Sequence, residues 1–163
     1  RAGGRKIIGI SWRSGNAFLG ADKTAKLSNF ASILAVTGCF FVNLQYGNCG
    51  AEIAEAGAEI FQDPAVDHVA DIEAALAQAA AMDLVITTSN TTAHLAGALN
   101  VPTWTLVANG FGGLWHWFLE REDSPWYPAM RLFRQRLQGD WQPVIESIGS
   151  ALTDFVAQWR RVE

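Results

Sequence analysis

The sequence predicts a doubly wound α/β domain built on a six-stranded, mostly parallel, Rossmann-like sheet. Strand-like apolar runs alternate with helical patterns, and several of the runs are nearly continuous Val, Ile, Leu and Phe. Such runs are typical of strands that helices cover on both faces. Strands and helices that alternate at this spacing indicate parallel strands joined by right-handed crossovers. The chain has 163 residues, which fits one domain over residues 1–163.

Six apolar runs are the predicted strands. They cover residues 6–12, 39–45, 58–61, 83–88, 102–107 and 130–134. The segments between them carry helical spacing. One face is shared by Leu27, Phe30, Ile33 and Leu34. Asp71 is the predicted cap of a helix over residues 72–82. The apolar stripe of that helix is Ile72, Ala75, Leu76 and Ala79.

The last helix is predicted to begin near Asp140. Its apolar side comprises Val144, Ile148, Leu152, Phe155, Val156 and Trp159. The segment over residues 108–128 is the longest without a clear strand pattern, and it is rich in Gly, Trp and Pro. We expect one short helix in it, around residues 115–119.

Composition excludes several classes of function. The net charge of −4 gives no basic surface for general nucleic-acid binding. Residues 1–5 lack the apolar core of a secretory signal, and no window approaches the ~18 apolar residues of a membrane span, so we expect a cytoplasmic protein. The first residue is Arg1 and not Met, which suggests a fragment of a longer protein. Two cysteines and three histidines make neither a disulfide framework nor a zinc site.

The segment that follows the fourth strand carries the most informative polar residues. It reads T-T-S-N-T-T-A-H, and Asn90 is a favoured residue for capping a helix that begins there. Backbone N–H groups at a helix start attract anions. Thr91, Thr92 and His94 would add further donors, so these four residues suit a diphosphate. The alternative is an ordinary capped helix with His94 at the edge of the core.

The loop after the first strand is polar and basic. It contains Arg13, Gly15, Asn16, Lys23 and Lys26. Ligands of open α/β sheets bind beyond the carboxyl ends of the strands, and the first and fourth strands are neighbours at the switch point. Cations of this loop could therefore face an anion held at the fourth strand; the alternative is a solvated loop. Neither a Gly-x-Gly-x-x-Gly pattern nor a Walker loop is present.

Three further candidates stand in other loops. Gln45 ends the second strand and could point at a ligand, or it could belong to a turn. Asp71 could touch a ribose or base edge, although a helix cap is the simpler role. Trp117 belongs to an aromatic cluster with Trp115, Trp126 and Tyr127. This cluster is either a sugar-stacking surface or a small core that holds a long loop in place.

Four ordered strings of the sequence resemble one family. They are L-V-I-T-T-S-N-T-T-A-H-L-A-G-A-L-N-V-P-T-W, G-I-S-W-R-S-G-N, F-V-N-L-Q-Y-G and R-E-D-S-P-W-Y-P-A-M-R-L-F-R-Q followed by G-D-W. Together they resemble the heptosyltransferase-like glycosyltransferases of family nine, and are most similar to the bacterial branch linked to tetratricopeptide repeats. The resemblance extends over residues 7–152.

The resemblance implies the C-terminal, nucleotide-sugar-binding half of a GT-B glycosyltransferase. It places Asn90, Thr91, Thr92 and His94 on the diphosphate, and Arg13 with a lysine, for which we take Lys26, at the leaving group. It further implies that the N-terminal GT-B half, and possibly tetratricopeptide repeats, belong to the parent chain. Contacts to nucleotide or sugar are expected from Gly15, Asn16, Lys23, Gln45, Asp71 and Trp117.

The expected function is therefore sugar transfer from a nucleoside diphosphate donor to an acceptor, without cofactor or metal. The donor would be a substrate, and we expect the isolated domain to be inactive because half of the cleft is missing. The alternative is a non-catalytic nucleotide- or protein-binding module of the same fold. A nucleotide-sugar epimerase would need a pair of carboxylates facing the sugar, and the sequence shows no convincing pair.

Overall fold

The computed structural model describes residues 2–160, with side chains described as far as residue 158. Its centre is a six-stranded sheet in the order β3-β2-β1-β4-β5-β6, and every neighbouring pair of strands is parallel. The strands are β1 (Lys6–Ser11), β2 (Cys39–Asn43), β3 (Ile60–Phe61), β4 (Leu84–Thr88), β5 (Thr103–Val107) and β6 (Met130–Arg134). The doubly wound α/β fold predicted from the apolar runs is confirmed.

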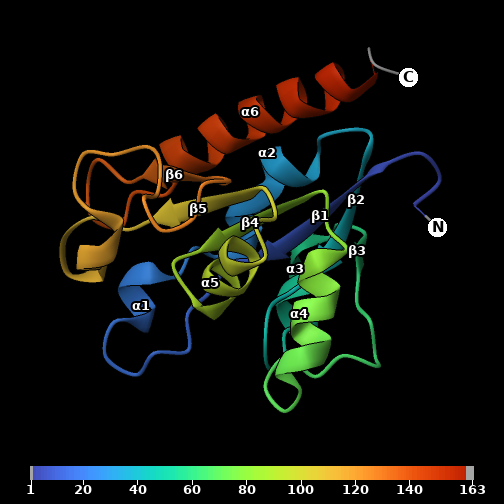
Figure 1. Cartoon of the computed structure of the whole chain (residues 1–163), viewed down its shortest axis with the longest axis horizontal. Coiled ribbons are helices and arrows are strands. Elements are labelled where there is room, and N and C mark those ends of the chain that lie inside the picture. The colour runs from blue at the N-terminus through green and yellow to red at the C-terminus, as the bar shows by residue number, and fades with distance from the viewer. Residues whose placement is uncertain (1, 161–163) are drawn as a thin grey trace.

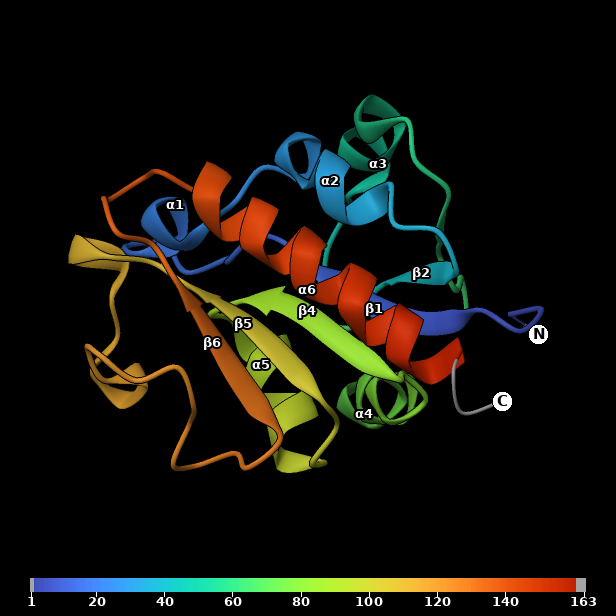
Figure 2. The same ribbon diagram turned by 90° about the horizontal axis from the view of Figure 1, so that it is seen from above.

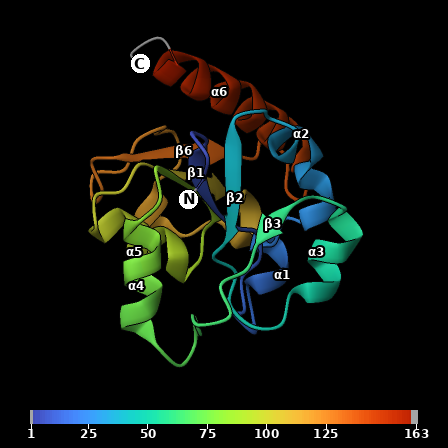
Figure 3. The ribbon, with the colours of Figure 1, turned by 90° about the vertical axis from the view of Figure 1, so that its right-hand side faces the viewer.

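Helices cover both faces of the sheet (Figures 1 and 3). One face carries α2 (Ala31–Leu34), α3 (Gly50–Ala56) and α6 (Gln142–Arg160), and the other carries α4 (Ile72–Ala80) and α5 (Thr91–Ala98). The remaining turns are α1 (Gly20–Lys23) and three 3-10 helices, η1 (Leu27–Phe30), η2 (Gly110–Gly112) and η3 (Trp115–Trp117). Seen from above, α6 runs diagonally across the sheet (Figure 2).

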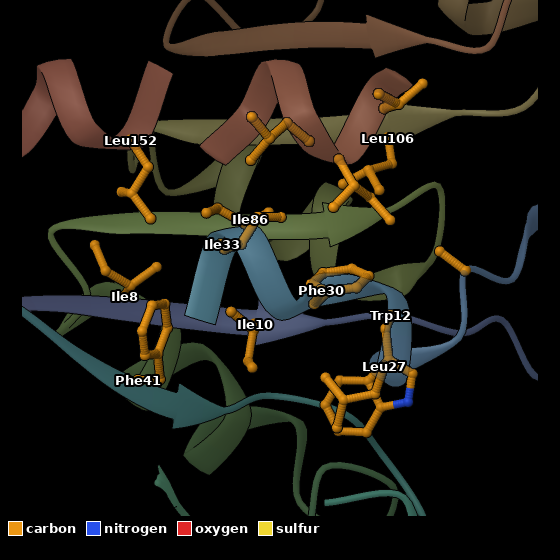
Figure 4. Packing of buried hydrophobic residues seen from close by; sticks show 14 of the residues in the cluster. Ile8, Ile10, Trp12, Leu27, Phe30, Ile33, Phe41, Ile86, Leu106 and Leu152 are labelled. Carbon is orange, nitrogen blue, oxygen red and sulfur yellow. The ribbon is translucent and has the colours of Figure 1, made fainter. Parts of the chain in front are cut away.

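The larger core lies between the sheet and α6. Ile8 and Ile10 of β1 both point toward this face, and they contact Phe30 of η1 and Ile33 of α2 (Figure 4). Ile145, Ile148 and Leu152 of α6 close the cluster from above and are fully buried. Because side chains of a strand alternate between its faces, Val85 of β4 belongs instead to the core under α4 and α5. Both faces are thus buried, as the continuous apolar runs require.

Several predicted elements differ from the structure in detail. The helix expected around Leu27–Leu34 begins as a 3-10 turn before it becomes α2, and the helix expected at residues 115–119 is the 3-10 turn η3. The cap at Asp71 is confirmed, since its carboxylate accepts from Ala74 N at 2.9 Å. Ile72 was wrongly placed on the buried stripe: it is 52% exposed at the first helical position, whereas Ala75 and Ala79 are buried.

The last helix starts at Gln142, and Val144, Ile148, Leu152 and Val156 are buried as predicted. The side chain of Trp159 lies outside the described residues. No helix within residues 2–160 combines the length and apolarity needed to cross a membrane.

Candidate functional site

Three loops converge beyond the carboxyl ends of β1, β4 and β5. β1 and β4 are neighbours, with Ser11 opposite Thr87 in register, although they lie far apart in the sequence. The chain leaves β1 toward β2 on one side and β4 toward β5 on the other, so this is the topological switch point. Ligands of open α/β sheets bind at such a point. The side chains gathered here are therefore the candidates for function.

A pair of buried amides fixes the end of β1. Gln45 Oε1 accepts hydrogen bonds from Ser11 Oγ at 3.1 Å and from the backbone N of Trp12 and of Arg13, both at 2.9 Å. Asn90 Nδ2 donates to Ser11 Oγ at 2.8 Å and to the carbonyl of Arg13 at 3.0 Å. Backbone groups at the end of a buried strand need such partners. Gln45 and Asn90 therefore use their side chains to position the first loop.

The start of α5 is largely satisfied by the protein itself. Asn90 is its N-cap, as predicted, and its Oδ1 accepts from Thr92 N at 2.9 Å and from Thr87 Oγ1 at 3.0 Å. The Thr92 hydroxyl donates to the carbonyl of Leu44 at 3.4 Å and is buried, while Thr91 is exposed. Of the four predicted diphosphate ligands, Asn90 and Thr92 thus turn their side chains inward, and Thr91 and His94 do not share those contacts.

His94 lies in an aromatic wall one turn into α5. Its Nδ1 is 2.9 Å from the Tyr127 hydroxyl, and its ring stacks on Trp117 with centroids 5.3 Å apart at 15°. Gly97 makes room for this wall, since a Cβ there would lie 2.6 Å from Tyr127 Cγ. The pKa of His94 is lowered, mainly by burial and further by the nearby charges of His116 and Lys23. At neutral pH the imidazole is therefore poised as an uncharged donor or acceptor.

Trp117 is fully buried, which corrects its assignment as a sugar-stacking residue. Its indole Nε1 donates to Ser89 Oγ at 2.7 Å, and the ring packs with Ala93, Val107 and Met130. A buried indole with a satisfied N–H belongs to a core. The alternative interpretation, a small core that holds the long loop, therefore describes Trp117. The neighbouring Trp115 is exposed instead.

Lys23 brings a positive charge on a largely buried side chain to the same place. The residue is only 6% exposed, yet within residues 2–160 its ammonium makes neither a hydrogen bond nor an ion pair. Burial lowers the pKa of Lys23, and Lys23 in turn lowers the pKa of both His94 and His116. An ammonium that loses part of its hydration and gains no partner is destabilised, and a bound anion would stabilise it.

His116 completes a group of side chains that can carry positive charge. Its ring centroid is 5.2 Å from that of His94, and its Nε2 is buried without a hydrogen-bond partner in the described structure. Burial is the first cause of its lowered pKa and Lys23 the second. We call Lys23, His94 and His116 the cationic cluster. Within residues 2–160 no carboxylate forms an ion pair with any of the three.

Close packing holds α1, and with it Lys23, against the loop after β5. A Cβ on Gly112 would lie 2.7 Å from Ala108 Cβ and 3.1 Å from the carbonyl carbon of Asp22, so only glycine allows this approach. Asn16 Oδ1 accepts from the backbone N of Phe18 and of Leu19, at 2.9 and 2.8 Å, and so forms the turn that leads into α1. The predicted ligand Asn16 therefore has a structural role in this loop.

Other predicted site residues lie apart from the cationic cluster or are already engaged. Arg13 Nε pairs with Glu52 Oε1 at 2.9 Å, and its guanidinium also donates to the carbonyl of Asn48 at 3.0 Å. Lys26 is exposed at the start of η1 and has no ion pair in the described chain. Gly15 is exposed, and its N–H donates to the Tyr46 hydroxyl. Lys23, and not Lys26, is the lysine whose charge acts on His94 and His116.

Sequence reasoning missed His116 as a member of the site. The sequence does place His116 directly before Trp117 in W-H-W. Because both belong to one short turn, burial of Trp117 also fixes the position of His116. Asp71 caps α4 and is exposed. Within residues 2–160, no group of three or more His, Cys, Asp or Glu side chains is arranged to hold a metal ion.

Mild acid is expected to destabilise the chain through these two histidines. In the unfolded chain they titrate near the ordinary value of 6.5, whereas burial lowers their pKa in the folded chain. The unfolded state then binds more protons as the pH falls through ~6.5, so the free energy of unfolding decreases. Urea denaturation from about pH 7.5 to about 5.5 measures this slope. Replacing both His94 and His116 by Asn should flatten it, and an unchanged slope in the double variant would contradict the assignment.

Comparison with known proteins relates the chain to one longer protein. No family model matches, and no solved structure matches. Among curated proteins, the chain is 39% identical over 158 residues to Protein FlbA of Caulobacter vibrioides. The match covers 92% of this chain and 25% of that protein, so the chain spans about a quarter of the relative's length. A domain of this kind therefore occurs there as one part of a larger chain.

Proposed function

We propose that this domain binds the diphosphate of a nucleotide sugar at the cationic cluster and forms the donor-binding half of a glycosyltransferase. In the parent protein it would serve transfer of the sugar to an acceptor. The proposal is supported by the family resemblance of its strand-to-helix segments and by the position of the cluster at the switch point of a parallel sheet. The nucleotide sugar is a substrate in this scheme, and no cofactor is involved.

The observation that carries the proposal is the ammonium of Lys23, which ends a largely buried side chain and has no hydrogen-bond or ion-pair partner within residues 2–160. Within residues 2–160 no carboxylate pairs with this charge, and burial of the side chain lowers its pKa, so the partial loss of hydration is not compensated. A diphosphate between Lys23, His94 and His116 would give each of them a charge-assisted hydrogen bond. It would also raise the pKa of all three groups, so binding is coupled to proton uptake.

The same cluster suits a departing diphosphate. Negative charge grows on the diphosphate as the sugar leaves, and donors that are already in place stabilise it without reorganisation. Protein cations then take the role that a metal plays in other transferases. A general base would have to come from outside the cluster, since no carboxylate pairs with it in the described chain. That observation also favours the second candidate, a nucleotide-binding module without activity of its own.

Calorimetric titration of the 163-residue chain tests the proposal. UDP, GDP and ADP are the probes, each compared with its monophosphate, in the wild type and in His94→Ala. We expect diphosphate affinity to fall tenfold to a hundredfold, because a charge-assisted hydrogen bond contributes about 1.5–3 kcal/mol. His68→Ala, on the loop before α4, is the matched control.

The outcome separates a ligand-binding histidine from a structural one. Equal losses for diphosphate and monophosphate would remove His94 from the diphosphate site. A lower melting temperature with unchanged affinity would show that His94 serves packing with Trp117 and Tyr127. If the wild type bound none of the three diphosphates, the proposed function would fail as a whole.

A further inference from the structure

A cavity of about 820 Å³ lies beyond the ends of β5 and β6, next to the cationic cluster. Val107 closes it from β5, Arg134 and Gln135 from the end of β6, and Trp115 and Phe118 from the long loop. Its size is that of a small-molecule site, and its wall is mostly apolar with a few polar groups. The proposed diphosphate site does not account for this cavity.

The outer wall of the cavity is held by one guanidinium. Arg134 donates from Nε to the carbonyl of Arg121 at 2.6 Å, from one terminal nitrogen to that of Phe118 at 3.0 Å, and from the other to that of Trp117. Phe118 has a φ of 58°, an unfavourable value for a bulky residue. Strain of this kind persists where the surroundings fix the backbone. The wall of the cavity is therefore held in place by specific contacts of the fold.

An unpaired donor stands in the cavity wall. Gln135 Oε1 accepts from Asn109 N at 3.1 Å and from Gly139 N at 3.3 Å, which fixes the orientation of the amide. Its Nε2 is buried and has no partner in the described chain. A buried donor without an acceptor is destabilising, and a ligand oxygen would satisfy it.

An exposed indole links the cavity to the cationic cluster. Trp115 lines the cavity and is 79% exposed. Its ring centroid is 5.7 Å from that of His116 at an angle of 86°, and the His116 ring is 5.2 Å from His94. A group attached to a diphosphate at His94 and His116 would thus meet Trp115 next.

We propose that this cavity receives the sugar ring of the nucleotide sugar, an inference that rests on the proposed function. Trp115 would stack on the apolar C–H face of the ring, and Gln135 Nε2 would donate to one of its oxygens. The carboxylate of Glu120, also in the lining, can accept from sugar hydroxyls.

The test compares Trp115→Ala with Phe111→Ala. Both residues are 79% exposed and lie on the same loop, but Phe111 does not line the cavity. The probes are UDP with UDP-glucose, GDP with GDP-mannose and ADP with ADP-glucose, titrated into the wild type and both variants. For the nucleotide sugar that the wild type binds, we expect Trp115→Ala to lower its affinity about tenfold and to leave the affinity for the corresponding bare diphosphate unchanged. Phe111→Ala should change neither.

Gln135→Glu is the second variant, because a carboxylate still accepts from Asn109 N and Gly139 N but no longer donates to the ligand. It should weaken nucleotide-sugar binding and not diphosphate binding. Saturation transfer from aromatic protons to sugar protons gives an independent readout, which Trp115→Ala should abolish.

Three results would overturn the sugar site. One is an equal loss of diphosphate and nucleotide-sugar affinity in Trp115→Ala, which would place the nucleoside in the cavity. Another is wild-type binding of diphosphates with no added affinity for any of the three nucleotide sugars. The third is undiminished saturation transfer to sugar protons in Trp115→Ala. Absence of diphosphate binding is a different result, since it defeats the proposed function itself.

Discussion

Replacing Lys23 by methionine is expected to stabilise the chain and, at the same time, to weaken its binding of nucleoside diphosphates. Methionine is slightly shorter but keeps the unbranched, flexible shape of the side chain, and it removes a charge that has no partner within residues 2–160 from a largely buried residue. Relief of ~1 kcal/mol would raise the melting temperature by about 2–4 °C in a protein of this size. Loss of a charge-assisted hydrogen bond would lower affinity about tenfold to a hundredfold.

Opposite signs for stability and affinity make this test decisive. A residue kept for packing alone should lose stability on substitution and leave the affinity of folded molecules unchanged. Lys26→Met is the matched control, because Lys26 is exposed and three residues away. It should change neither quantity. If Lys23→Met destabilised the chain and left UDP, GDP and ADP binding intact, Lys23 would have no part in an anion site.

The largest loss of stability is expected from Gln45→Ala. This change removes one buried oxygen that accepts from Ser11 Oγ and from the backbone N of Trp12 and of Arg13. Each donor left unsatisfied costs about 1–3 kcal/mol, and partial access of water reduces the sum. We therefore expect about 3–5 kcal/mol by urea denaturation, at the upper end of single substitutions.

Gln45→Glu separates the acceptor from the rest of the side chain. A carboxylate can accept all three hydrogen bonds, but it loses the long contact from Nε2 to the carbonyl of Tyr46, at 3.4 Å, and brings a charge to a position that is 1% exposed. Because three donors remain to stabilise that charge, we expect Gln45→Glu to lose less stability than Gln45→Ala at neutral pH. Equal losses in Gln45→Ala and Gln45→Glu would mean that the three hydrogen bonds contribute little, and that the packing of the amide matters instead.

The fold could be predicted because its determinants are local. Continuous apolar runs such as that of β4 identify strands buried on both faces, and Asn90 and Asp71 act through backbone groups two or three residues away. The two-residue length of β3 was harder to predict. Only Ile60 and Phe61 pair with β2, and nothing in the apolar pattern marks where the pairing stops.

The candidate site was predicted less well, because its determinants are distant in the sequence. Gln45 turns inward because the backbone of the neighbouring strand needs an acceptor there, a demand that arises only once β1 and β2 are paired. Lys23 rather than Lys26 reaches the histidines because Asn16 starts a helical turn that buries Lys23. His116 joins the site because its neighbour Trp117 is buried, and their adjacency in W-H-W is the one signal of this in the sequence.

The fork of Arg134 grips carbonyl oxygens only, those of Trp117, Phe118 and Arg121. Every residue type has a backbone carbonyl, so these hydrogen bonds hold the loop in the same path whichever side chains it carries. Residues such as Leu119 and Glu120 can then be exchanged without disturbing the clamp. A lineage that keeps one arginine can thus vary the wall of the neighbouring cavity freely, and new ligand preferences can arise on an unchanged scaffold.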